Sequence, residues 1–465
     1  MKTLLASTMA LAGASALPSP ARRLARLLAA ATLTALLAAP LAACTDDSTG
    51  PSQTGTGLAA GAGGAAGGAG GQAGSGAIGG SGANGGSAGS GGCDGTAALE
   101  ALLQGLRNDL GAAQQAQSEA AGWPAPVCDG YLFVSASATL TSVAGDHDAW
   151  AGTPMTADQG FHWLVLPVAA GDHYKFTDGV SYQADPWSRS YMYDDNGEIS
   201  LVVPTEAHLE RYFAVGDANM QARTIRVWLP VGVPSHVLYV HDGQNLFDPS
   251  APYGGWKLQD SVPGDMMLVG IDNTPARMDE YTHVQDFING GLTGGLGDEY
   301  ADFVQASVRG LVADRYAEPT HVGVMGSSLG GLISFHIALR FPGQYDFAAS
   351  LSGTMGWGSI GLTGGAENET MIQRYATAGH GSTPLYLDSG GNATACVDSD
   401  GDGTEDDDPT ASDNYCENRQ MEQTLYTAGY VANTDVWHWW EPNATHDEAA
   451  WAARVFRPMQ IFAGL

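Results

Sequence analysis

The chain has 465 residues and carries 19 Lys and Arg against 50 Asp and Glu, a formal net charge of −31 at pH 7. Proteins that bind nucleic acid use Lys and Arg to neutralise phosphates, so this composition argues against a nucleic-acid partner. Five cysteines without the Cys-x-x-Cys or Cys/His spacing of metal sites argue against a zinc protein.

Residues 1–43 have the pattern of an export signal. A basic cluster at 22–26 precedes an apolar stretch at 27–39, which is too short to span a bilayer as a stable helix. The stretch ends in Leu41-Ala-Ala-Cys44, which resembles the lipobox of bacterial lipoproteins. That resemblance implies a lipid on Cys44, membrane contact through this anchor only, and a location at the outer membrane, the cell surface or the periplasm. A plain secretory signal with a chance cysteine is the alternative.

Residues 44–92 are mostly Gly, Ala and Ser and have almost no bulky side chains. Such a segment cannot bury a core, so we expect a flexible tether with a reach on the order of 35–40 Å. Residues 93–127 then carry leucines at helical spacing, stopped by Gly122-Trp-Pro124, which predicts a helical segment with a packing role.

Residues 128–205 consist of short alternating apolar runs separated by glycine turns. This spacing predicts a small immunoglobulin-like β-sandwich. The motifs at 143–150, 174–179 and 184–187 resemble early-set modules related to carbohydrate-binding module family 48, which implies sugar contacts by Trp150 and Lys175. Against this, a tryptophan in a small sandwich is more often a core residue, and many such modules attached to esterases only shape the rim of the active site.

The segment 321–331 joins an apolar strand, a Gly-x-Ser-x-Gly turn and a helical run. This order is typical of a nucleophile elbow, in which a strained turn holds a serine Oγ clear of the backbone. The same pattern around Ser87 lacks both flanking elements. We therefore predict Ser328 as a nucleophile and the N–H of Leu329 as an oxyanion donor.

A serine nucleophile needs a base, and in α/β-hydrolases a histidine follows the serine and the acid along the chain. His446 lies between a strand-like run at 434–440 and a final helix at 448–462, where this order places it. An isolated histidine is more often a surface or core residue, but at His446 the place and the order agree.

Four motifs, at 238–247, 269–277, 325–331 and around His446, resemble the putative-esterase family of α/β-hydrolases over residues 206–465. The resemblance implies an α/β-hydrolase catalytic domain and a serine esterase without a catalytic cofactor. It also implies a second oxyanion N–H from Gln244, with Asp242 facing the substrate. An ordinary Asp-Gly turn is the alternative for that loop.

The family places the triad acid shortly after the strand-like run at 383–388. Asp388 lies within this run, slightly too early, and an inserted loop at 392–412 separates it from Asp413 at the start of the next helix. We predict Asp413 as the acid and keep Asp388 as the alternative. Stabilisation of the helix N-terminus is the other interpretation of Asp413.

The inserted loop places oxygen-bearing side chains at alternate positions around glycines, as calcium loops do. The predicted ligands of a structural calcium are Asp398, Asp400, Asp402, Thr404 and Asp406. Pro409 stands where an EF-hand has its bidentate Glu, so the loop resembles an isolated extracellular calcium loop of the thrombospondin-repeat kind. A solvated acidic loop is the alternative. With Cys44 set aside, we expect the disulfides 93–128 and 396–416.

These features predict an exported lipoprotein that hydrolyses carboxylic esters through an acyl-enzyme. Feruloyl or acetyl esters on plant polysaccharides are the expected substrates, because an outward-facing tethered enzyme suits a polymer too large to import. A siderophore trilactone esterase of the enterochelin type shares the fold, but the basic residues with which it normally meets its chelate are scarce here. A non-catalytic sugar-binding surface lipoprotein is the third hypothesis, against which the serine, histidine and oxyanion motifs argue.

Overall fold

The computed structural model describes residues 95–465 apart from residues 289, 317–318, 362–367, 394–395, 399–400, 406 and 408–412. The predicted signal peptide, lipobox and tether, with Cys44 and Cys93, lie outside this part of the chain. No helix in the described part has both the length and the apolar composition that a membrane span requires.

Two helices, α2 (Gly95–Asn108) and α3 (Leu110–Ala120), occupy the predicted helical segment. Asp109 separates them, and its side chain accepts a hydrogen bond from the N–H of Ala112 at the start of α3, at 3.0 Å. Leu103 and Leu106 of α2 pack against the first strands of the chain, in a cluster that includes Trp123. The leucine spacing thus gives one buried helix face.

The following region contains two groups of strands that share a core. One sheet has the order β1-β2-β6-β5, and β3, β4, β7, β8, β9 and β10 lie in a second sheet. Phe133 of the first sheet packs with Val143, Tyr174 and Phe176 of the second. The bounds are β1 (Ala125–Val127), β2 (Gly130–Ser135), β3 (Ser142–Gly145), β4 (Thr153–Pro154), β5 (Thr156–Ala157), β6 (His162–Leu166), β7 (His173–Thr177), β8 (Tyr182–Gln183), β9 (Ser190–Asp194) and β10 (Gly197–Leu201), with a short turn η1 (Asp146–Asp148).

The relation of this region to immunoglobulin-like modules stays a prediction. The structure does bear on its two predicted sugar contacts. Lys175 is buried and its ammonium group donates to the carbonyl of Asn196 at 3.1 Å, so it is held by the protein. Trp150 is partly exposed, and its indole N–H donates to Asp146 at 3.2 Å. Burial therefore removes Lys175 from the predicted sugar-binding surface.

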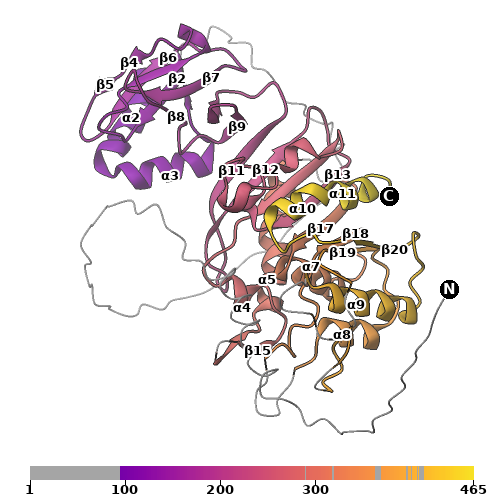
Figure 1. The fold of residues 1–465 in the computed structure, drawn as a ribbon. Coiled ribbons are helices and arrows are strands. Elements are labelled where there is room, and N and C mark those ends of the chain that lie inside the picture. The colour runs from indigo at the N-terminus through magenta and orange to yellow at the C-terminus, as the bar shows by residue number, and fades with distance from the viewer. Residues whose placement is uncertain are drawn as a thin grey trace, which may run out of the picture. The chain divides into compact units, whose positions relative to one another are not determined.

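A mixed sheet forms the framework of the C-terminal part (Figure 1). Its strand order is β20-β19-β18-β17-β13-β14-β12-β11, in which the strands from β14 to β20 are parallel neighbours, and β12 pairs antiparallel with β14 and β11. The bounds are β11 (His208–Val215), β12 (Arg223–Leu229), β13 (His236–His241), β14 (Met266–Ile271), β17 (His321–Ser327), β18 (Phe347–Leu351), β19 (Leu385–Ser389) and β20 (Val436–Trp440). Parallel strands joined by helices form the α/β architecture that the sequence predicts.

Beyond β11 the same sheet continues into the N-terminal strands. Leu209 and Glu210 of β11 pair antiparallel with Tyr191 and Ser190 of β9. Arg211 adds to this junction, because its guanidinium lies 3.8 Å from the centroid of the Tyr191 ring and forms an ion pair with Glu198. The predicted boundary near residue 205 is therefore crossed by backbone hydrogen bonds.

Successive residues of the central strands face opposite sides of the sheet, and both sides are buried. In β13, Val237 and Tyr239 belong to one core cluster, and Leu238 and Val240 to the other. The helices that cover the first cluster are α5 (Gly297–Phe303), α6 (Arg309–Arg315), α7 (Leu329–Arg340), α8 (Met371–Ala378) and α9 (Tyr415–Ala428), with a π-helical turn η5 (Val304–Val308) between α5 and α6. On the second cluster lie α10 (Glu448–Arg454) and α11 (Phe456–Phe462).

The remaining short elements lie in the connections. They are η2 (Gly243–Asn245), η3 (Pro252–Gly254), η4 (Leu258–Asp260), α4 (Arg277–Glu280) and the hairpin of β15 (Gln285–Ile288) and β16 (Gly291–Gly294). In all, the connections that follow β13, β17, β19 and β20 carry the residues predicted for catalysis.

The inserted loop is closed by the predicted disulfide between Cys396 and Cys416, whose Cα atoms lie 5.4 Å apart. The 396–416 pair is thus confirmed. Cys128 is also disulfide-bonded, while its predicted partner Cys93 lies outside the described residues.

Of the predicted calcium ligands, Asp400 and Asp406 lie outside the described residues. The Asp398 carboxylate accepts hydrogen bonds from the N–H groups of residues 401, 402 and 403, and Asp402 accepts one from the N–H of Thr404. The Thr404 hydroxyl is buried 2.9 Å from that of Ser359. Within the described residues, no group of three or more His, Cys, Asp or Glu side chains is arranged to hold a metal ion.

Candidate active site

The predicted nucleophile lies in the turn between β17 and α7. Ser328 has φ 56° and ψ −123°, a conformation that costs a non-glycine residue energy and persists only where the surroundings hold it. Gly326 allows the close approach this requires, because a Cβ there would lie 2.6 Å from the backbone of Gly330. The sharp turn holds the Ser328 side chain at the point where strand becomes helix, the geometry of a nucleophile elbow.

Thr354, from the loop after β18, contacts Ser328. Its hydroxyl lies 3.5 Å from the Ser328 Oγ, and its N–H donates to the Ser328 carbonyl at 3.3 Å. Among the described residues, no hydrogen bond joins Ser328 to His446. Catalytic hydrogen bonds are often long in unliganded enzymes and tighten when substrate binds.

His446 lies in the loop before α10 and is held by Asp413. The imidazole Nδ1 is 2.7 Å from Asp413 Oδ1, and the ring packs edge-on against Trp451 at a centroid distance of 5.0 Å. An ionised carboxylate only accepts hydrogen bonds, so Nδ1 is the donor and Nε2 is left with the lone pair. This is the tautomer that a general base needs.

The structure places Asp413, rather than Asp388, against the imidazole. Asp413 does not cap α9: the N-cap of that helix is Asn414, and no side chain caps the helix there. Its second oxygen, Oδ2, accepts hydrogen bonds from the N–H of Gly390 and the hydroxyl of Ser352, both at 2.6 Å. The carboxylate is thus fixed on one side by the protein and directed at His446 on the other.

Asp388 lies at the end of β19 and is fully buried. It accepts hydrogen bonds from the Arg454 Nε at 3.0 Å, the Tyr386 hydroxyl at 3.0 Å and the N–H of Ser352 at 3.1 Å. Burial raises the pKa of Asp388 above its usual value, although Arg454 and Tyr386 act in the opposite direction. Its partners are structural, and none of them is His446.

The two predicted oxyanion donors belong to loops that approach each other. A Cβ on Gly330 would lie 3.4 Å from the His241 Cβ and 3.5 Å from the Asp242 Oδ2, which puts the loop after β13 against the start of α7. Within the described part of the chain, no group accepts a hydrogen bond from the N–H of Leu329 or of Gln244. Unpaired N–H groups beside a nucleophile are what an oxyanion hole requires.

Asp242, in the same loop as Gln244, is held by partners within the protein. Its backbone is left-handed, with φ 62°, and its carboxylate is buried in a bidentate pair with Arg277 at 2.7 and 2.8 Å, with a further bond from the Asn273 amide at 2.6 Å. Burial by itself raises the pKa of Asp242, but the Arg277 guanidinium outweighs it and holds this pKa below its usual value. The carboxylate is therefore held by Arg277 and Asn273 and fixes the Gln244 loop, and its contact with substrate stays a prediction.

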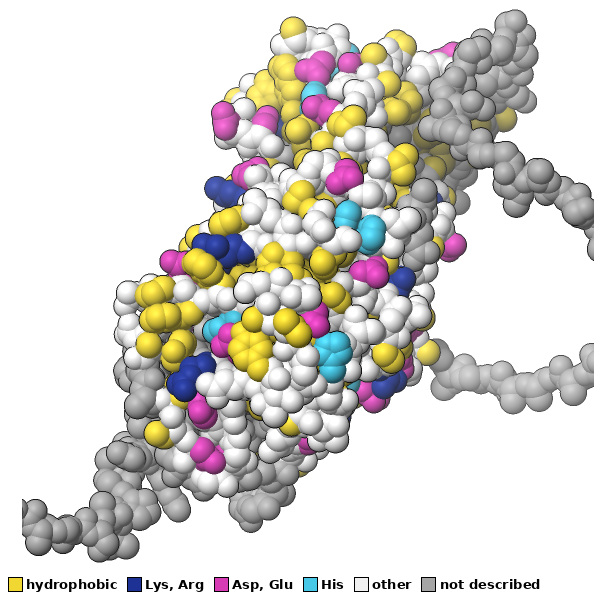
Figure 2. Space-filling view, turned by 90° about the vertical axis from the view of Figure 1, so that its right-hand side faces the viewer, with side chains coloured by type: hydrophobic (Ala, Val, Ile, Leu, Met, Phe, Trp, Pro, Cys, Tyr) yellow, Lys and Arg dark blue, Asp and Glu magenta, His cyan; other side chains and the backbone are white. Residues whose placement is uncertain are grey.

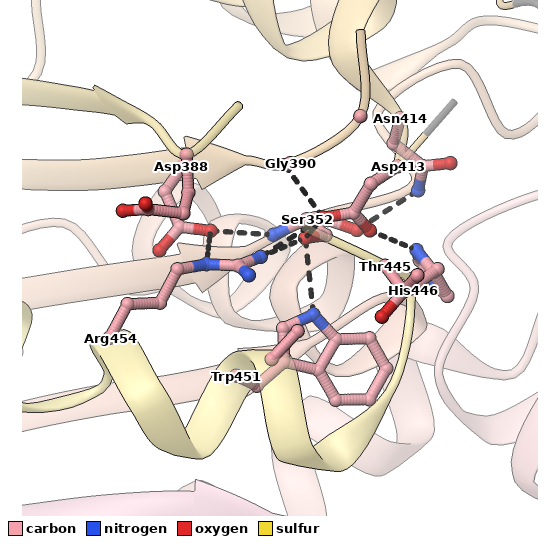
Figure 3. A network of polar contacts seen from close by, with 12 residues as sticks. Ser352, Asp388, Gly390, Asp413, Asn414, Thr445, His446, Trp451 and Arg454 are labelled. Carbon is pink, nitrogen blue, oxygen red and sulfur yellow. Dashed lines mark hydrogen bonds and ion pairs between the residues drawn. The ribbon is translucent and has the colours of Figure 1, made fainter. Parts of the chain in front are cut away.

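Three residues that surround the Asp413 carboxylate were not found from the sequence: Ser352, Trp451 and Arg454 (Figure 3). The Trp451 indole donates to the Ser352 Oγ at 3.1 Å, and the Arg454 Nη2 donates to the same oxygen and to Asp413. A signal for Arg454 exists in the chain. It lies between Trp451 and Val455 on the apolar face of the last helices, and a buried arginine requires an acidic partner.

Comparisons with known proteins identify a family that covers this part of the chain. Residues 218–462 match the family described as "Putative esterase". An uncharacterized protein of Bacillus subtilis strain 168, YbbA, is 30% identical over 129 residues, which cover 25% of this chain and 49% of YbbA. The match thus spans about half the length of that relative.

Several solved structures are also similar. An IroE-like serine hydrolase from Shewanella oneidensis is 16% identical with a TM-score of 0.40, over 54% of this chain and 79% of that chain. The siderophore hydrolase EstA from Aspergillus nidulans is 17% identical with a TM-score of 0.41, over 54% and 94%. The enterobactin esterase FES from Shigella flexneri is 15% identical with a TM-score of 0.38, over 72% of this chain and 92% of that chain. Similarity this low does not indicate a substrate.

The family match covers more than half of the chain and contains the Ser328 turn, Asp413 and His446. These residues follow one another along the chain in the order serine, aspartate, histidine, on the loops of an α/β sheet. The chain therefore belongs to the putative-esterase family.

Proposed function

We propose that this protein is a serine carboxylic-ester hydrolase that works through an acyl-enzyme. The observation that carries the proposal is the 2.7 Å contact between Asp413 and the His446 Nδ1. The same chain has a strained elbow at Ser328. A carboxylate–imidazole pair of this kind prepares a serine for nucleophilic attack, and neutral carbonyl substrates are what it attacks.

In the proposed reaction, the Ser328 Oγ attacks the ester carbonyl carbon while the His446 Nε2 takes the hydroxyl proton. The carbonyl oxygen becomes an oxyanion that accepts hydrogen bonds from the N–H groups of Leu329 and Gln244. His446 then gives the proton to the leaving alkoxide, which departs as the alcohol. Water, activated by the same imidazole, releases the acid and restores Ser328.

For the substrate we propose feruloyl or acetyl esters carried by plant polysaccharides, with a siderophore trilactone as the competing class. Catecholate chelates of iron are anionic and favour a gathered basic surface. On the face drawn in Figure 2, Lys and Arg side chains lie scattered among acidic and neutral ones. A neutral sugar ester needs no such surface, and the excess of 50 Asp and Glu over 19 Lys and Arg in the chain supports the polysaccharide esters.

The test is a hydrolysis panel of p-nitrophenyl acetate, methyl ferulate, acetylxylan and a catecholate trilactone, with Ser328→Ala as the blank. We expect hydrolysis of p-nitrophenyl acetate and of at least one plant ester. Preferential cleavage of the trilactone would replace the substrate proposal and keep the mechanism. No serine-dependent hydrolysis of any of the four esters would contradict the proposed function.

We also propose that the protein is anchored through a lipid on Cys44. A buried acyl chain contributes roughly 0.8 kcal/mol per CH₂, so several chains hold a protein firmly where one does not. Wild-type protein expressed in a bacterium is expected to fractionate with membranes and to incorporate labelled palmitate, and Cys44→Ala to lose both properties. Recovery of the wild type as soluble, unlabelled protein would contradict the anchor.

The inserted loop is proposed to bind calcium, on the spacing of its acidic side chains from 398 to 406. If calcium binds only the folded state, a concentration of a hundred times Kd adds about 2.7 kcal/mol to the free energy of unfolding. Chelation is therefore expected to lower Tm while esterase activity on p-nitrophenyl acetate persists. Identical melting curves in chelator and in millimolar calcium would leave the loop as an acidic turn closed by the 396–416 disulfide.

A further inference from the structure

Behind the His446–Asp413 pair, two carboxylates and one guanidinium are buried together (Figure 3). The side chains of Asp388 and Asp413 are 0% exposed and that of Arg454 is 2% exposed. Arg454 lies between them: its Nε is 3.0 Å from Asp388 Oδ1 and its Nη2 is 3.1 Å from Asp413 Oδ2. Arg454 is the cation in direct contact with both carboxylates.

This arrangement has a clear charge balance. Burying an ion without a partner costs several kcal/mol, and two carboxylates in one dry site tend to share a proton. Burial, followed by the nearby charge of Asp413, raises the pKa of Asp388, and the contact with Arg454 opposes both. Two other titratable groups contact these carboxylates. The Tyr386 hydroxyl donates a hydrogen bond to Asp388, and the His446 imidazole contacts Asp413.

Arg454 also acts on Asp413 through Ser352. The Ser352 Oγ accepts hydrogen bonds from the Arg454 Nη2 and the Trp451 Nε1, and so directs its own proton to Asp413 Oδ2 at 2.6 Å. Both contacts keep Oδ2 occupied and leave Oδ1 for the imidazole. The orientation of the carboxylate that meets His446 is therefore set from the side of Arg454.

We propose that Arg454 is a positioning residue of the triad: its guanidinium holds the Asp413 carboxyl group in place beside Asp388, so that Asp413 accepts a hydrogen bond from the His446 Nδ1–H and orients the ring. The inference rests on the proposed esterase function. Arg454 reaches no reacting atom and acts through Asp413. The competing explanation is that Arg454 only attaches α10 to β19 and contributes stability.

The test compares Arg454→Met with the double variant Arg454→Met/Asp388→Asn. Loss of the cation leaves two buried carboxylates that take up a proton, so the single variant is expected to lose about a hundredfold in kcat/KM at pH 7. Raising the pH removes this proton and restores activity. The acid limb of the plot of kcat/KM against pH is therefore expected at higher pH in Arg454→Met than in wild type. The double variant also lacks the Asp388 charge. Its kcat/KM is expected to be at least about tenfold higher than that of Arg454→Met, with the acid limb closer to its wild-type position.

A matched control is Arg457→Met, which removes an arginine from the next helix whose guanidinium lies 3.4 Å from the centroid of the Trp439 ring. It is expected to leave the acid limb in place. A purely structural role for Arg454 predicts no shift of the limb in Arg454→Met and a double variant no better than the single one. Either result would overturn the proposal.

Two further measurements keep the test decisive. If Arg454→Met does not fold, Arg454→Lys replaces it, because lysine retains the positive charge. Its acid limb is expected at the wild-type position, with a lower kcat. A shifted limb in Arg454→Lys would count against the proposal. NMR titration of His446 needs no substrate, and the ring is expected to titrate at lower pH in Arg454→Met than in wild type. Unchanged titration refutes the inference, whereas a wild type inactive on all esters refutes only the proposed function.

Discussion

Replacing Ser328 with alanine is expected to lower kcat on p-nitrophenyl acetate by at least about a thousandfold, because no other group takes over as nucleophile. The fold is expected to remain. The Ser328 hydroxyl makes one marginal contact, 3.5 Å to Thr354, so its loss removes little stabilising energy. Steady-state kinetics together with the thermal unfolding curve check both parts of the expectation.

The chain offers a matched control in the neighbouring serine. Ser327 ends β17, is buried and occupies ordinary strand backbone, whereas Ser328 holds the strained turn. Ser327→Ala is expected to stay within about tenfold of wild type, since it removes a hydroxyl that takes no part in the reaction. Full activity in Ser328→Ala, or an equal loss in both variants, would show that the elbow has been misassigned.

Asp413→Asn is expected to reduce kcat by about ten-thousandfold. An asparagine amide donates a hydrogen bond to the imidazole Nδ1, which places the ring proton on Nε2 and removes the lone pair that the serine needs. Circular dichroism and Tm check that the fold is kept, because the amide has the shape of the carboxylate. The measured quantity is kcat for p-nitrophenyl acetate at neutral pH.

The comparison variant is Asp388→Asn, at the other aspartate considered for the acid. It weakens buried hydrogen bonds with Arg454 and Tyr386, so the free energy of unfolding is expected to fall by about 1–3 kcal/mol. Turnover is expected to fall far less than in Asp413→Asn, since Asp388 does not contact His446. The reverse ranking of the two variants in kcat would move the role of the acid to Asp388.

The parts of the site that are local in the chain could be predicted from the sequence. The elbow depends on Gly326, Ser328 and Gly330, which lie within one turn, and β17 and α7 follow from the period of the apolar residues around them. His446 was identified by its order in the chain. Asp413 required counting across an insertion, and the contact that distinguishes it from Asp388 joins residues 33 positions apart.

What could not be predicted depends on tertiary packing. Arg454 meets Ser352 across 102 positions and Asp388 across 66, and no local pattern encodes such contacts. The buried pair of Asp242 with Arg277 joins residues 35 positions apart, and it too was not predicted. The pairing of β9 with β11 was not predicted either, because the sequence of a strand does not specify which other strand lies beside it in the sheet.

The β9–β11 pairing bears on how this catalytic domain can be separated or recombined. Strand β11 uses one edge for β12 and the other for β9. A chain shortened to residues 206–465 would present the second edge as a row of unsatisfied N–H and C=O groups, a template for intermolecular association. It would also uncover Leu209, which packs beside Tyr191 in the buried cluster. Gene fusion or domain shuffling with this chain therefore has its natural joint before α2, whose leucines pack against the first strands, and not between the two regions.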